Sequence, residues 1–203
     1  MAIQIIGYVL SADTTGATIG CRMNSSNQPK LGEMIKIPSR DSLIYGIITN
    51  ILILDDGLVR QLATTTPIQE GIIQDNRENR TVPMEFHILF IGHKRDERIF
   101  HLLPPQPPLS LESVALCTPQ DMLSFSSSNR FGYLRYLVAQ EETRYFDAVA
   151  AHFELMSTIL PEDKKDSWKE GATRSLVHLY RNDYETLSQM LHTLADTSVF
   201  ADR

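Results

Sequence analysis

Cysteine is scarce in this sequence: Cys21 and Cys117 are the only two among 203 residues, and both stand in apolar, strand-like surroundings. The N-terminus also lacks the basic region and long apolar core of a secretory signal, so we expect two buried, reduced thiols rather than a disulfide. Long hydrophobic runs are missing as well, since no stretch approaches the roughly 18 uninterrupted apolar residues of a membrane-spanning helix. These absences predict a cytoplasmic protein with no membrane partner.

The chain also lacks an excess of positive charge. Its formal net charge is −6, with ten Lys or Arg against thirteen Asp or Glu in residues 1–125 and nine against twelve in residues 126–203. A protein that holds nucleic acid by itself normally shows a basic patch that neutralises phosphates. We therefore expect no direct nucleic-acid binding, while a local basic patch inside the acidic average stays open.

Motifs for catalysis or cofactor binding are absent. Nucleotide hydrolysis needs a glycine-rich loop that ends in Gly-Lys-Ser/Thr, and the segment 92–94 (Gly-His-Lys) has neither the preceding glycine nor the following hydroxyl. The acidic and basic run 161–165 is typical of a solvated helix start rather than of a nuclease centre. Glu85 and His87 lack a third metal ligand, and the serines of 124–128 lack the glycines of a nucleophile elbow. We expect no enzyme, no cofactor and no metal site.

Short β-branched runs, punctuated by single glycines, dominate the first part of the chain. Such runs are typical of strands, and a glycine inside a strand marks a bulge, a bend or a close backbone approach. Repeated bends predict a small closed β-barrel. The runs are 3–10, 32–37, 43–54, 83–92 and 113–117, and the glycines expected to be structurally required are Gly7, Gly32, Gly46 and Gly92.

Three further segments have distinct expectations. The run 43–54 is nearly continuous in apolar residues, which predicts a strand buried on both sides. The prolines of 104–108 cannot donate ladder hydrogen bonds, so we expect that segment outside the sheet. Residues 58–81 end in a very polar run and are expected to form a surface excursion.

The order of the glycine-containing runs resembles the HAS barrel. This domain is the N-terminal β-barrel of HerA-type hexameric DNA translocases and of the catalytic subunits of rotary ATP synthases. The resemblance covers 1–125 and implies a barrel that assembles into rings or docks onto partners, here without the ATPase domain. The residues that carry it are Ile6-Gly7-Tyr8-Val9, Leu31-Gly32-Glu33, Tyr45-Gly46-Ile47-Ile48 and Ile88-Leu89-Phe90-Ile91-Gly92.

After the serine-rich stretch 124–129 the hydrophobic period changes from two to about 3.6, which predicts helices. Apolar stripes run through 131–138, 146–160, 168–179 and 184–194. The predicted fold is therefore α+β, with a barrel over 1–125 and a C-terminal bundle of about four short helices over 126–203.

These features together predict a non-enzymatic assembly or adaptor module. We expect its barrel to dock onto a second copy, giving a homo-oligomer, or onto a HerA-type ATPase in DNA processing. A further interface is expected on the last helix, whose long stripe exceeds what a small bundle needs. The alternative, that this stripe is the core of the bundle itself, stays open. The members of the stripe are Tyr184, Leu187, Met190, Leu191 and Leu194.

The alternative is a divergent barrel that binds single-stranded nucleic acid. Small barrels often stack bases on exposed rings, and Phe86, Phe90 and Phe100 are the candidates. Strand alternation places Phe86 and Phe90 on one face, which favours core packing over base stacking.

Overall fold

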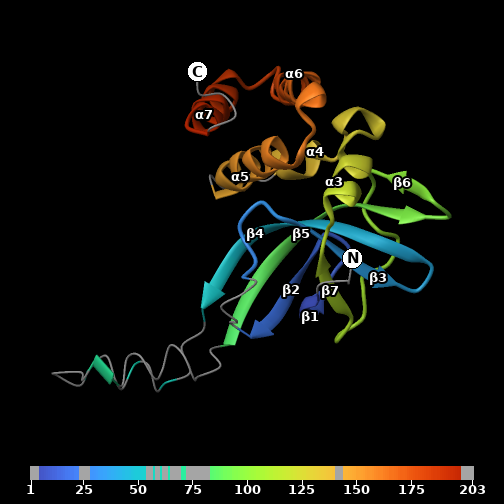
Figure 1. Ribbon diagram of the computed structural model, residues 1–203, viewed down its shortest axis with the longest axis vertical. Helices are drawn as coiled ribbons and strands as arrows, with labels where there is room; N and C mark the ends of the chain where they lie inside the picture. The colour runs from blue at the N-terminus through green and yellow to red at the C-terminus, as the bar shows by residue number, and fades with distance from the viewer. Residues whose placement is uncertain are drawn as a thin grey trace.

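The computed structural model describes residues 5–22, 28–53, 57, 60, 64, 70–71, 83–139 and 144–197. Within these ranges the chain forms seven strands, then five α-helices and a short 3₁₀ helix (Figure 1). The protein is α+β, as predicted. Most of the surface excursion expected over 58–81 lies outside the described residues.

Six of the strands close into an antiparallel barrel. Around the ring the order is β2, β1, β7, β3, β4 and β5, and pairing between β5 and β2 completes the closure. Strand β6 continues from β5 as a hairpin on the outside of this ring. The strands are β1 (Ile5–Ala12), β2 (Gly16–Arg22), β3 (Met34–Ser39), β4 (Ser42–Ile53), β5 (Pro83–Arg95), β6 (Arg98–Phe100) and β7 (Ser113–Leu116). The closed barrel expected from the sequence is confirmed.

The chain enters the barrel through the hairpin of β1 and β2. The carboxylate of Asp13 accepts hydrogen bonds from the backbone N–H groups of Thr15 and Gly16, at 2.6 and 3.0 Å. Asp at this place supplies the local bonds that hold a tight turn. The proline segment after β6 lies outside the sheet, as its missing N–H groups require.

Strand β4 is buried on both sides, which explains its continuous apolar sequence. Ile44 and Ile48 belong to the cluster that fills the barrel, whereas Tyr45 and Ile47 belong to a second cluster shared with the helices. All four side chains are at most 3% exposed. The two clusters explain why this strand lacks the polar alternation of a surface strand.

The structure has five α-helices in the described residues, so the predicted count of about four is too low. The additional helix, α3, begins with a capping box in which Thr118 and Asp121 bond each other's backbone N–H, and Pro119 occupies its first turn. Sequence periodicity missed it because eight residues are too few to display an apolar stripe. The helices are α3 (Pro119–Ser126), α4 (Leu134–Val138), α5 (Arg144–Ile159), α6 (Glu162–Leu179) and α7 (Tyr184–Ala195), with the 3₁₀ helix η1 (Asn129–Phe131) between α3 and α4.

The helices form a layer against one side of the barrel. In Figure 1, α4 and α5 lie next to the strands, and α6 and α7 lie on the far side of α5. Contacts join α4 to β5 and α5 to β4. Helix α3 spans the boundary expected after residue 125, and its last residue, Ser126, is fully buried and accepts a hydrogen bond from Trp168 Nε1 at 3.2 Å. The division into 1–125 and 126–203 stays a prediction.

Candidate functional site

An apolar patch lies on the outside of the barrel where β1 meets the turn that precedes β7. Alternation along β1 buries Val9 completely and leaves its neighbours on either side outside. The turn lies against β1 through hydrogen bonds from Leu111 N to Val9 O, at 2.8 Å, and from Ser110 Oγ to Leu10 O, at 3.5 Å. We call this surface the barrel patch; its exposed side chains are Ile5 (52%), Tyr8 (50%), Leu10 (46%), Leu109 (57%) and Leu111 (74%).

Leu111 is the most exposed member of the barrel patch and also has the least favourable backbone. The N–H of Glu112 bonds to the carbonyl of Leu109 at 3.2 Å, which puts Leu111 at the third position of a β-turn with φ of +68°. That position favours glycine or asparagine. An exposed leucine therefore bears two costs, backbone strain and contact with water.

Closure of the barrel determines how this surface can be used. Strand β1 has hydrogen-bonded neighbours on both sides, β2 and β7, so its backbone offers no free edge to a further strand. A protein that docks here meets side chains rather than backbone groups. The patch therefore suits packing of two apolar surfaces, not β-strand addition.

The predicted interface on α7 is divided by the fold. Met190 and Leu194 are at most 1% exposed and belong to the core shared with the other helices. Tyr184 is 82% exposed and Leu191 is 38% exposed, while Leu187 is half-buried against the same core. Five residues on one helical stripe thus have two different environments, and only the outer ones are available to a partner.

The four glycines singled out from the sequence all lie where a side chain meets the opposing backbone or core. A Cβ on Gly7 would lie 2.7 Å from the carbonyl oxygen of Gly20, one on Gly46 would meet Ile88, and one on Gly92 would meet the Phe100 carbonyl. Gly32 has φ of +79°, and a Cβ there would lie 2.5 Å from the backbone nitrogen of His152 on α5. Gly32 therefore allows helix α5 to approach the barrel at the start of β3.

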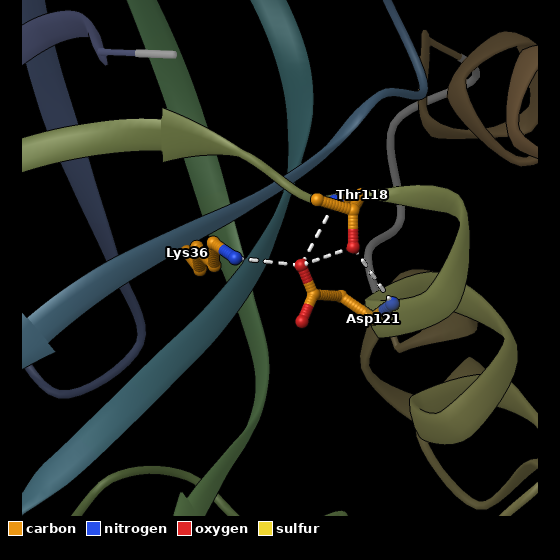
Figure 2. Close-up of polar contacts among 3 residues, drawn as sticks. All are labelled: Lys36, Thr118 and Asp121. Atoms are coloured by element: carbon orange, nitrogen blue, oxygen red, sulfur yellow. Dashed lines mark hydrogen bonds and ion pairs between the residues drawn. The ribbon is translucent and has the colours of Figure 1, made fainter. Parts of the chain in front are cut away.

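A polar joint attaches α3 to the barrel wall. The Nζ of Lys36, on β3, lies 2.6 Å from Oδ2 of Asp121, and the same oxygen accepts bonds of 2.8 Å from the backbone N–H and the hydroxyl of Thr118 (Figure 2). Burial alone raises the pKa of Asp121, but the hydrogen bonds from Lys36 and Thr118 outweigh it, so this pKa is lower than usual. The carboxylate thus caps its own helix and fixes that helix to β3.

The buried histidine of α5 is also structural. His152 is completely buried on α5; its Nδ1–H donates to the Gly32 carbonyl at 3.2 Å, and its Nε2 accepts from the hydroxyl of Tyr133 at 3.0 Å. Burial lowers the pKa of His152 to about 4 and raises that of Tyr133. Both ring nitrogens are occupied and no solvent reaches them, so this pair joins the helices to the barrel and cannot transfer protons to a substrate.

The rings of the nucleic-acid alternative are mostly unavailable. Phe86 and Phe90 are fully buried inside the barrel. Phe100 is half-buried, with the His93 ring stacked on it at 5.2 Å and the Arg98 guanidinium 5.6 Å from its centre. Two of the three rings therefore have no face on which a base can stack.

Other site types are not formed by the described residues. No three His, Cys, Asp or Glu side chains gather there in a way that could hold a metal ion. The described helices include none that is both long enough and apolar enough to cross a bilayer. Cys117 is buried and Cys21 is half-buried, both as free thiols.

Comparison with known proteins assigns no family. The sequence matches no protein-family model, and no curated protein matches it. Identity with the HAS barrel therefore stays a prediction, carried by the glycine order and compatible with the closed six-stranded barrel.

The barrel patch was not predicted from the sequence. A signal was present, because β1 has apolar residues in both phases of its alternation: Val9 packs in the barrel interior, and Tyr8 and Leu10 lie outside. A strand with apolar residues on both of its faces needs other parts of a protein packed against both faces. In the described structure the outer side chains Tyr8 and Leu10 of β1 stay about half exposed.

Proposed function

We propose that this protein is a non-enzymatic assembly module that docks through the outer face of its barrel. The partner is a second copy of the chain or a HerA-type DNA-translocating ATPase. The observation that carries this proposal is the barrel patch, which includes the strained and exposed Leu111. A solitary protein gains nothing from keeping a leucine in that turn, whereas an interface gains an apolar contact from it.

The size of the patch indicates a reversible contact. Its five side chains are 46–74% exposed, and burying the exposed part of each contributes about 1 kcal/mol, or about 5 kcal/mol for one surface. Association costs at least about 4 kcal/mol in lost rigid-body freedom. One such surface is therefore only marginally sufficient, and a ring or a partner that adds its own contacts stabilises the complex further.

Light scattering on the purified protein tests self-docking. We expect a concentration-dependent dimer or larger species, and we expect Tyr8→Glu to shift it to monomer because a carboxylate in the patch would be desolvated on docking. Val177→Glu is the matched control, since Val177 is 42% exposed on α6, away from the barrel. An unchanged assembly of Tyr8→Glu would refute docking through the patch.

Docking onto a HerA-type ATPase is tested with the same two variants. Calorimetric titration of the monomeric protein into a purified HerA-type ATPase from the same genome should show binding that Tyr8→Glu abolishes and Val177→Glu retains. If neither self-association nor ATPase binding is seen, the assembly function is wrong. Binding of a single-stranded oligonucleotide without a terminal phosphate, measured by fluorescence anisotropy at low salt, would instead support the nucleic-acid alternative.

A further inference from the structure

A polar pocket lies at the end of the barrel where the turn between β3 and β4 meets the end of β5. It has a volume of about 290 Å³, and three separate chain segments form its wall. Its lining residues are Ser39, Arg40, Asp41, Ser42, His93, Arg95, Pro105 and Gln106. This pocket is near the lower limit of roughly 300–1,000 Å³ for small-molecule sites, so it suits a ligand of a few heavy atoms.

The pocket is locally positive in an acidic protein. Arg40 and Arg95 outnumber the single acid in the lining, Asp41, whereas the whole chain carries a net charge of −6. Arg95 Nε is 4.0 Å from the exposed carboxylate of Asp96, the outer limit of an ion pair, so its guanidinium keeps donors for another acceptor. Two arginines, one in the turn between β3 and β4 and one at the end of β5, can thus bind one anion from two directions.

Arg40 occupies a position that the turn itself does not favour. Ser39 pairs with Ser42, so Arg40 and Asp41 form a two-residue hairpin loop, and Arg40 has φ of +38°. Such loops favour glycine or asparagine at positions of positive φ. An arginine here is locally unfavourable, which indicates that its side chain serves a purpose outside the turn.

His93 supplies a second kind of group. It is 5% exposed, and its Nδ1–H donates to the carbonyl of Leu102 at 3.0 Å, which fixes the tautomer. In the neutral ring, Nε2 then carries a lone pair, and no described residue donates to it. A ligand that fills the pocket meets arginine donors and, at His93, an acceptor.

From this combination we infer that the pocket binds hydrogen phosphate. Its ionised oxygens accept from the two guanidinium groups, and its single hydroxyl donates to Nε2 of His93. Sulfate has the same shape but no proton at neutral pH, so it would leave Nε2 without a donor. The site contains none of the backbone cradle of a nucleotide loop, and it recognises the phosphate ion itself.

Isothermal calorimetry with inorganic phosphate at low ionic strength tests the site, with sulfate and phosphoserine as parallel titrants. We expect saturable phosphate binding, at least fivefold weaker sulfate binding, and at least tenfold weaker phosphate binding in both Arg40→Gln and Arg95→Gln. Arg174→Gln is the control, because Arg174 pairs with Glu170 on the surface of α6. Equal binding of sulfate and phosphate would overturn the assignment, and so would phosphoserine binding that exceeds phosphate binding.

Arg40→Gly separates binding from folding. Glycine adopts a positive φ without strain, so this variant should melt at the same temperature as the parent protein or at a higher one. Its affinity for phosphate should be at least tenfold lower. A variant that loses stability in circular dichroism melts would show that Arg40 holds the turn. A variant that keeps phosphate binding would show that the arginine does not contact the ligand; either result refutes the inference.

Discussion

Acidification should weaken the fold through the buried ring of His152. The ring is completely buried and neutral, and burial lowers its pKa to about 4 from the ordinary 6.5. The unfolded chain takes up a proton on this residue near pH 6.5, but the folded protein does not do so until about pH 4. The unfolded state therefore binds more protons in this window, and the stability due to neutral His152 is lost as the pH falls from 6.5 towards 4.

The size of the effect follows from the two pKa values. Their difference of about 2.5 units corresponds to about 3 kcal/mol once both states are protonated, and about 2 kcal/mol of this is already lost at pH 5. The lowered pKa of Asp121 acts only below its ordinary value near 4, so it lies outside this window. His101 also has a pKa lowered by burial and adds a loss of the same sign.

Urea denaturation at pH 7.5 and pH 5 measures the change in the free energy of unfolding. Comparison with His152→Gln isolates the contribution of this ring, because all other titrating groups are shared; we expect the variant to lose about 2 kcal/mol less between the two pH values. His178→Gln, on the surface of α6, should behave as the parent protein does. If His152→Gln is too unstable to measure, an NMR titration of the His152 ring in the parent protein decides. A midpoint near 6.5 would refute the reasoning.

Three further perturbations test other parts of the structure. Asp121→Ala should lower the free energy of unfolding, measured by urea denaturation, by about 2 kcal/mol, about half from the lost helix cap and half from the lost Lys36 ion pair. A double-mutant cycle with Lys36→Met that shows no coupling would contradict the pairing. Leu111→Gly should raise stability by about 1 kcal/mol and weaken self-association in light scattering; a fall in stability would show that Leu111 serves the fold. Gly46→Val should destabilise by about 1 kcal/mol or more because its side chain meets Ile88, whereas Gly71→Val, with no neighbour within 4 Å, should change the melting temperature little.

The barrel was predictable because its information is local. Single glycines and β-branched runs mark strands within a few residues, and the continuous apolar run of β4 indicated cover on both sides, which the two core clusters supply. Helix α3 was missed because its signal is a cap, Thr118 with Asp121, rather than a period. Periodicity identifies long helices and capping identifies short ones, so the two signals have to be read together.

The surfaces were less predictable because exposure depends on distant segments. Spacing correctly placed Leu187, Met190 and Leu194 on one stripe of α7, but contact with α5 decides that Met190 and Leu194 are core. In the same way, the phosphate pocket joins Arg40 to His93 across two strands and a turn. A local sequence pattern cannot predict which residues, distant along the chain, line the same pocket.

Closure of the barrel also constrains the order in which the chain can fold. The first hairpin, β1 and β2, forms both seams of the ring, one with β5 and one with β7, and the paired residues are separated by roughly 60 to 70 and roughly 110 positions, respectively. During synthesis the outer edge of β2 stays unpaired until β5, which ends at Arg95, has left the ribosome, and the outer edge of β1 stays unpaired until β7, which ends at Leu116, has left it. Because such non-local pairing is slow and unpaired edges invite aggregation, the nascent chain is most vulnerable in that interval, before the helices that follow β7 are made.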